Sequence, residues 1–136
     1  MATTTASITL SSNDLIPGMP LTYYKQATLD KADGCSGLEE IQRRMMTYRS
    51  TGQVDLLTWA ATVAKEDGAN KIYIKNHSPL KTEYCIISIG GEVLGRIYGQ
   101  DWCFFPWSGG STNDIEVNPQ FVGSSMVIEY ILIHEI

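Results

Sequence analysis

The second half of the chain alternates apolar and polar positions with the period of β-strands. From Lys71 onward, short runs rich in Ile, Val and Tyr are separated by turn residues such as Gly90-Gly91 and Asn118-Pro119. The runs are 72–74, 84–89, 93–98, 115–117 and 126–134. Branched and aromatic residues in runs of this length, bounded by turn signals, are typical of strands. We therefore predict an antiparallel sheet or a small β-sandwich here.

The run Met126–His134 carries the strongest strand signal. Its alternate positions Met126, Ile128, Tyr130 and Leu132 share one face, whereas Val127 and Ile131 lie on the other face beside Glu129. Because side chains alternate across a strand, this run is apolar on both faces. Such a pattern predicts a central strand that is covered on both sides.

Residues 37–67 follow the period of helices instead. Ser36 and Glu39 have the spacing of a capping box, in which each side chain satisfies a free backbone N–H of the first turn. Apolar residues then recur at helical spacing in two stripes: Leu38, Ile41, Met45 and Tyr48, then Leu56, Ala60, Val63 and Ala64. Gly52 and Gly68 are the expected helix ends. We therefore predict a helical hairpin over about residues 37–67, and with the strands this gives the α+β class.

Residues 1–34 are polar with short apolar patches. Pro17, Gly18 and Pro20 exclude a helix there and predict a turn between two short extended pieces. Residues 1–136 are expected to form a single domain, with residues 1–7 flexible.

Composition narrows the class of protein. The chain has 136 residues, of which 43% are hydrophobic and 18% charged, so it is neither a disordered tail nor a coiled coil. Its net charge of −5 argues against nucleic acid as a partner, because phosphate binding requires clustered Lys and Arg. The N-terminus lacks the charged and apolar regions of a signal peptide. We therefore expect a cytoplasmic protein, one released by an unconventional route, or a piece cut from a precursor.

Catalytic chemistry has no clear signal in the sequence. Cys35, Cys85 and Cys103 do not have the spacing of a zinc or redox motif, so three buried thiols are expected, with one disulfide and one free thiol as the alternative. His77 and His134 are expected on the surface. Because no phosphate-binding loop, nucleophile elbow or metal motif is present, we expect no enzyme, cofactor or metal.

An aromatic segment from Tyr98 to Gly110 is the most unusual stretch of the chain. Its rings either fill the core of a small sheet or project from a loop to contact lipid or sugar. Strand alternation places Trp102 and Phe104 on one face and Cys103 and Phe105 on the other. Trp107 lies between Pro106 and a flexible Ser-Gly-Gly stretch, and is expected to project from a loop. The candidate lipid- or glycan-binding residues are Tyr98, Trp102, Phe104, Phe105 and Trp107.

Part of this stretch resembles the aegerolysin family. The residues that carry the resemblance are Asp101-Trp102-Cys103-Phe104-Phe105-Pro106-Trp107, Ser111-Thr112-Asn113 and Met126-Val127-Ile128-Glu129-Tyr130. They look like the family's aromatic-Cys-Pro-Trp segment, its Ser/Thr-Asn pair and its Trp-x-Ile-Glu-Tyr strand. The resemblance implies a β-sandwich that binds membrane lipids through exposed aromatic residues, in some cases with a larger protein partner. It implies a lipid-facing or supporting role for Trp102, Trp107 and Tyr130.

Two main hypotheses for function follow. The first is a non-enzymatic module that binds membrane lipid or glycan, as a component of a membrane-active toxin system. In that case Trp107→Ala is expected to abolish binding and leave the fold intact. The alternative is a self-assembling structural subunit of a particle, filament or inclusion, because low charge and two-sided apolar strands also suit subunit interfaces. A small enzyme with a His- or Cys-centred pocket is the third hypothesis.

Overall fold

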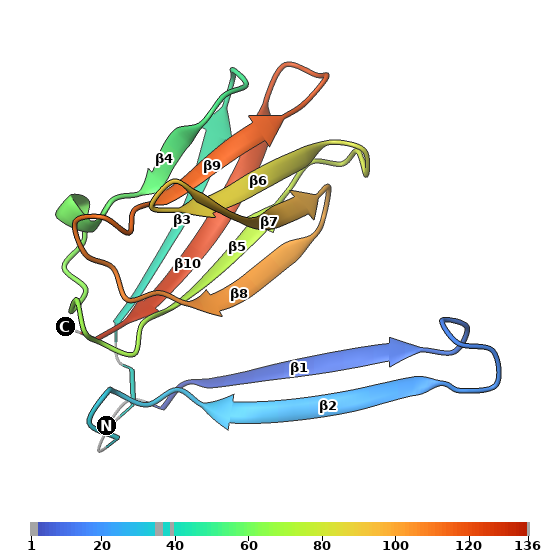
Figure 1. The fold of residues 1–136 in the computed structure, drawn as a ribbon, viewed down its shortest axis with the longest axis horizontal. Coiled ribbons are helices and arrows are strands. Elements are labelled where there is room, and N and C mark those ends of the chain that lie inside the picture. The colour runs from blue at the N-terminus through green and yellow to red at the C-terminus, as the bar shows by residue number, and fades with distance from the viewer. Residues whose placement is uncertain (1–2, 35–36, 39, 136) are drawn as a thin grey trace.

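The chain folds almost entirely into antiparallel β-strands. The computed structural model describes residues 3–34, 37–38 and 40–135, and these contain one short 3₁₀ turn, Trp59–Ala61, but no α-helix (Figure 1). The strands are β1 (Thr5–Ser12), β2 (Leu21–Thr28), β3 (Glu40–Tyr48), β4 (Val54–Leu57), β5 (Lys71–Asn76), β6 (Tyr84–Ile89), β7 (Glu92–Tyr98), β8 (Trp102–Pro106), β9 (Ile115–Gln120) and β10 (Met126–His134).

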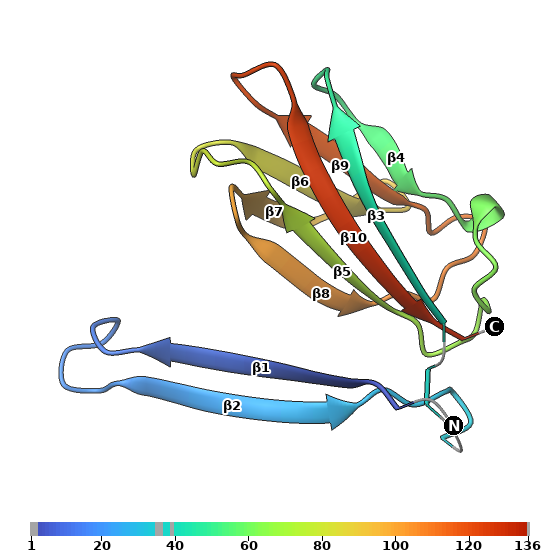
Figure 2. The same cartoon turned by 180° about the vertical axis from the view of Figure 1, so that it is seen from behind.

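Eight of these strands form a β-sandwich. One sheet has the order β3-β10-β5-β8 and the other the order β4-β9-β6-β7, and the two pack face to face (Figure 2). The core lies between them. Ile72 and Ile74 of β5, Ile87 of β6, Val117 of β9 and Ile128 of β10 are at most 1% exposed. The antiparallel strands predicted for the second half of the chain are thus confirmed as part of a sandwich, but β3 and β4 complete it, so the α+β class is wrong. Strand β10 lies between two other strands as expected, whereas the expected cover on both its faces is not found, since Val127 and Ile131 are only partly buried.

The predicted helical hairpin is wrong, because residues 40–48 form strand β3. This strand pairs with β10 along nine residues, from Glu40 opposite His134 to Tyr48 opposite Met126. The supposed helical stripe is divided between two faces: Ile41 and Met45 are exposed, whereas Tyr48 packs against the core. Pairing with a long apolar strand therefore outweighs the local helical spacing. The proposed capping residues Ser36 and Glu39 lie outside the described residues.

The second predicted helix is replaced by strand β4, the 3₁₀ turn and a loop. Leu57 pairs with Ile115 of β9, and the backbone N–H of Trp59 donates a hydrogen bond to the Asp114 carboxylate at 2.7 Å. Ala60 and Val63, which the helical stripe would bury, are exposed. Contacts with β9 and the loop before it therefore hold this segment in a non-helical path.

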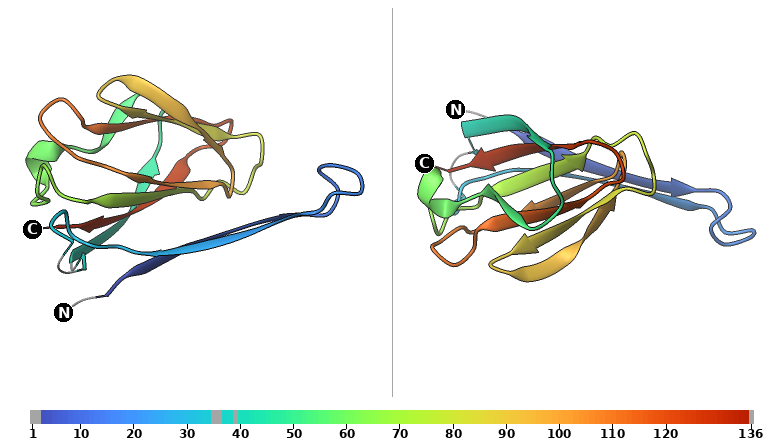
Figure 3. Two further views of the ribbon diagram at one scale, coloured as in Figure 1. Left: turned by 60° about the horizontal axis from the view of Figure 1, so that its bottom comes forward. Right: turned by 90° about the horizontal axis from the view of Figure 1, so that it is seen from above.

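Strands β1 and β2 form a long two-stranded ribbon, which we call the arm. They pair in full register, from Thr5 opposite Thr28 to Ser12 opposite Leu21, and a loop containing Pro17 and Gly18 joins them. The predicted turn between two extended pieces is thus confirmed. Residues 5–7, expected to be flexible, pair with residues 26–28. The arm extends beyond the sandwich, and its tip stands clear of it (Figure 3).

The base of the arm is tied to the sandwich by hydrogen bonds. The N–H of Leu29 donates to the carbonyl of Thr4 at 2.8 Å, and the N–H of Leu38 donates to the carbonyl of Leu29 at 3.0 Å. The buried Glu135 carboxylate accepts the N–H groups of Ala32 and Ala69, each at 2.9 Å. Glu135 therefore joins the segment after β2 to the segment before β5.

Protonation of Glu135 is expected to destabilise the fold. The backbone N–H of Ala69, that of Ala32 and the Lys65 ammonium lower the pKa of this carboxyl below its ordinary 4.5, because they favour its ionised form. Its contribution is therefore complete above about pH 4.5 and is lost as the pH falls through the lower, folded-state pKa. Glu135→Gln should cost about 1–3 kcal/mol at pH 7 and flatten this acid dependence. Urea unfolding between pH 2 and 7 measures both effects, and Glu92→Gln, at the exposed start of β7, is the control.

Candidate functional site

The predicted face alternation of strand β8 is confirmed. Trp102 and Phe104 are 49% and 38% exposed, whereas Cys103 and Phe105 pack against the core. Tyr98 is also exposed, but it belongs to β7 of the other sheet, where its ring packs against Tyr84 with centroids 5.4 Å apart. Of the five candidate binding residues, the structure therefore places Trp102 and Phe104 together at the surface.

Trp107 does not project from a loop. It is 2% exposed, and its indole Nε1–H donates a hydrogen bond to the carbonyl of Asn113 at 2.7 Å. Its ring meets the edge of Trp59 at a centroid distance of 5.9 Å. The following Gly109 has a φ of +72° and lies so close to the Trp59 ring that a side chain would clash with it. Trp107 is thus part of the core, and the expected surface role of its ring is not available.

Trp102 and Phe104 belong to a larger apolar surface, which we call the outer face. It is the side of the β3-β10-β5-β8 sheet that points away from the core. Cross-strand pairing arranges it in rows, such as Arg43, Ile131, Tyr73 and Phe104. The apolar members are Ile41 and Met45 on β3, Val127, Ile131 and Ile133 on β10, Tyr73 on β5, and Trp102 and Phe104 on β8. Ile41 and Met45 are 58% and 56% exposed.

An ion cluster lies within this apolar face. Glu129 is 5% exposed, and its carboxylate is bound by Arg43 Nε and, at 2.8 Å, by His77 Nε2. The hydrogen bond from His77, followed by that from Arg43, lowers the pKa of the Glu129 carboxyl. Lys75 lies opposite Glu129 on β5 and Met45 opposite it on β3. The carboxylate is therefore paired before anything covers the outer face.

The arm has one apolar face and one polar face. Directly opposed pairs share a face, so Ala6, Ile8, Leu10, Leu21, Tyr23 and Ala27 lie together, with Lys25 as the charged member. The opposite face consists of Thr5, Ser7, Thr9, Ser11, Thr22, Tyr24, Gln26 and Thr28. At the tip, Leu15, Ile16 and Met19 are also exposed.

A groove of about 720 Å³ separates the first part of the arm from the outer face. The arm contributes Ala6, Ser7, Ile8, Lys25, Gln26 and Ala27, and the sheet contributes Tyr73, Trp102, Cys103 and Phe104. The Tyr73 and Trp102 rings are in contact, with centroids 6.0 Å apart. Most of its lining is apolar, and Ser7, Lys25 and Gln26 are its polar members.

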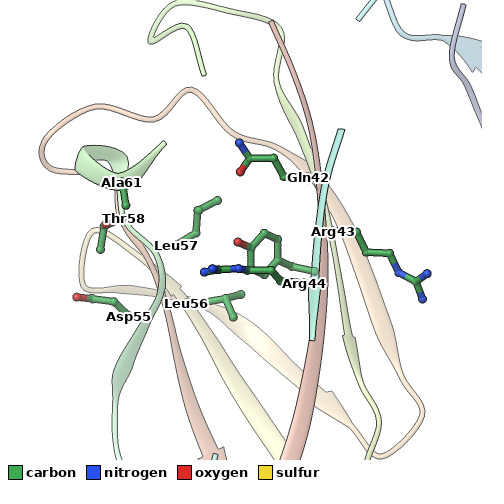
Figure 4. A pocket seen from close by; sticks show the side chains of 9 residues that line it. Gln42, Arg43, Arg44, Asp55, Leu56, Leu57, Thr58 and Ala61 are labelled. Carbon is green, nitrogen blue, oxygen red and sulfur yellow. The ribbon is translucent and has the colours of Figure 1, made fainter. Parts of the chain in front are cut away.

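A second pocket, of about 490 Å³, lies at the open side of the sandwich between β3 and β4 (Figure 4). Leu56, Leu57 and Tyr130 form its apolar part, and Arg44 of β3 and Asp55 of β4 are its oppositely charged members. The residues that line it include neither a cysteine nor a histidine. This composition suits a small polar ligand better than nucleophilic or proton-transfer chemistry.

The two cysteines that the structure describes do not have the lowered pKa of an activated nucleophile. Burial raises the pKa of the Cys85 thiol to about 12 and that of Cys103 to about 11, so both remain protonated and weakly nucleophilic. Cys85 and Cys103 are free, and Cys35 lies outside the described residues. His134 is buried, contrary to expectation. Within the described ranges, no group of three His, Cys, Asp or Glu side chains is placed to hold a metal ion.

Comparisons with known proteins place the chain in no family. No family model matches its sequence, and no match was found among curated proteins. In the described part of the chain, no helix is both long enough and apolar enough to cross a membrane.

The sequence predicted the two extended pieces of the arm, but neither their pairing into an amphipathic ribbon nor the outer face was predicted. The signal for the arm is present: apolar residues at every second position from Ala6 to Leu10 and again from Leu21 to Tyr23, with Ser and Thr between them on the first strand. Two such stretches flanking Pro17 and Gly18 indicate an amphipathic hairpin. Ile41 and Met45 also fit a helical spacing, and that spacing gives no sign of their place on the face of a sheet.

Trp107→Ala is expected to destabilise the protein by about 3–5 kcal/mol, because it removes a buried ring and leaves a cavity. Trp102→Ala is the matched control, since half of that side chain is already exposed, and it should cost less than about 1 kcal/mol. Urea unfolding followed by circular dichroism compares the two. Equal stabilities for both variants would contradict the core position of Trp107.

Proposed function

We propose that this protein is a non-enzymatic structural subunit that assembles with copies of itself through its arm. The observation that carries the proposal is the apolar face of the arm, which is left exposed on the isolated chain. Ile8, Leu10, Leu21 and Tyr23 each retain more than a third of their full exposure. An assembly of subunits would bury these side chains.

A two-stranded ribbon is a weak structure without such a partner. An isolated hairpin is marginally stable in water, because it has few side-chain contacts to offset its conformational entropy. Hydrogen bonds at its base hold the arm of this protein, but its tip stands clear of the sandwich (Figures 1 and 3). A subunit interface would supply the missing apolar contacts.

The total surface supports the same proposal. The chain exposes 8179 Å², whereas a compact monomer of 15.1 kDa exposes about 7,100 Å². The surplus of about 1,000 Å² exceeds the ~800 Å² that each partner buries in a standard protein interface. The exposed surface is therefore large enough to build a stable assembly.

Membrane-lipid or glycan binding is the second candidate. It is favoured by the exposed apolar tip of the arm, where Leu15 and Met19 are two-thirds exposed, and by the exposed Trp102 ring. The resemblance to aegerolysins points to the same function. The lipid- or glycan-binding candidate explains the exposed residues of the tip and of β8. Self-assembly also explains why the whole apolar face of the arm is exposed.

Self-assembly predicts that the protein forms oligomers whose mass rises with concentration. The double variant Leu10→Thr and Leu21→Thr should raise the dissociation constant at least tenfold, because it makes the outer part of the apolar face polar while keeping residues suited to strands. Size-exclusion chromatography with light scattering gives the masses. Thr9→Ser and Thr22→Ser on the polar face form the matched control and should assemble as the unmodified chain does.

Two results separate the candidates. A monomer at every concentration up to the millimolar range would contradict self-assembly. If that monomer then sediments with phosphatidylcholine and sphingomyelin vesicles, the lipid-binding candidate replaces it.

A further inference from the structure

We infer that the groove between the arm and the outer face receives the outer half of the arm from a second copy of the chain. This inference rests on the proposed self-assembly and names the surface that the arm occupies. The groove lies beside the first part of the arm, whereas the unpartnered large side chains lie further out along the same ribbon.

The arm lines the groove with a small pair, Ala6 and Ala27, and with the larger pair Ile8 and Lys25, whereas its outer large side chains are unpartnered. Ala6 and Ala27 form an opposed pair on the apolar face at the base of the arm, and both line the groove. Further out on the same face, Leu10 opposes Tyr23, and Leu21 follows opposite Ser12. The two alanines leave space beside Trp102, and the larger outer side chains are of the kind that fill it.

The arm of the same molecule cannot fill this groove with its own outer half. The pair Ser12 and Leu21 lies four residues beyond Ile8, which is about 13 Å along an extended strand. The paired strands hold these residues apart, since β1 and β2 are in register along their full length. Only the arm of another molecule can therefore bring Leu10, Leu21 and Tyr23 to the groove.

The chemistry of the groove also favours this occupant. Its sheet wall consists of Tyr73, Trp102, Cys103 and Phe104, which match an apolar ribbon in character. The arm carries a single cation, Lys25, between residues 5 and 12 and between 21 and 28, and no acidic residue there. The outer half of the arm, residues 9–12 and 21–24, carries no charge, so docking adds no second cation beside the Lys25 that lines the groove. The surplus surface of about 1,000 Å² on each chain is enough for a standard interface.

A mixing experiment tests this arrangement. Ala27→Trp fills the groove but keeps the outer half of the arm, whereas Leu10→Thr with Leu21→Thr alters the outer half but keeps the groove. Each variant alone should lose self-association at least tenfold. An equimolar mixture should form a one-to-one complex in native mass spectrometry, because the intact arm of the first enters the intact groove of the second. Thr28→Trp, which lies at the same end of the arm but does not line the groove, is the control.

The outcomes distinguish this inference from the proposed function. If the unmodified chain assembles and Ala27→Trp assembles equally well, the groove is not the binding surface, although self-assembly stands. The groove is also rejected if both variants lose assembly and their mixture forms no complex. Direct pairing of two arms would give that result, because it needs an intact arm on each molecule. If the unmodified chain stays monomeric, self-assembly itself fails. Circular dichroism of each variant checks that the sandwich is folded.

Discussion

A two-stranded ribbon with one apolar face cannot bury that face by itself, and the proposed assembly of this molecule depends on that constraint. The sandwich buries its apolar residues within a single chain: its two sheets enclose a continuous core, in which Ile72, Ile74 and Ile128 are fully buried. The arm has no second layer of its own. Leu10 and Tyr23 of this ribbon remain exposed, so the free energy of apolar burial is missing on the isolated chain, and we propose that a partner supplies it.

The sandwich prepares the surface on which that partner would dock. The Glu135 carboxylate accepts hydrogen bonds from Ala32, in the segment that follows β2, and from Ala69, in the segment before β5. These bonds tie the base of the arm to the sandwich. On the outer face, the Glu129 carboxylate is already bound by Arg43 and His77. Covering that face therefore does not leave the Glu129 carboxylate buried without a partner, which would cost several kcal/mol. Geometry and electrostatics thus both permit assembly.

The strands from β5 onward could be predicted from the sequence, because alternation and turn residues agree there. Residues 40–48 could not: helical and strand spacings both fit their apolar positions, and only pairing with β10 decides between them. Trp107 shows the same limit at the candidate site. Its loop suggested an exposed ring. The ring is instead held in the core by Trp59, which is distant in sequence, and by a hydrogen bond to the carbonyl of Asn113, which no sequence pattern indicates. The predicted alternation at Trp102 and Phe104 depended only on local geometry, and it was correct.

Hydrogen exchange along the arm, measured across a range of protein concentrations, tests the central claim most directly. Amides of β5, β6 and β10 should be protected at every concentration, because they lie inside the sandwich sheets. Amides of β1 and β2 should exchange rapidly in dilute protein and become protected as the concentration rises and the arm is covered by a second copy. Arm amides whose exchange is the same at all concentrations, while the sandwich is folded, would contradict the account.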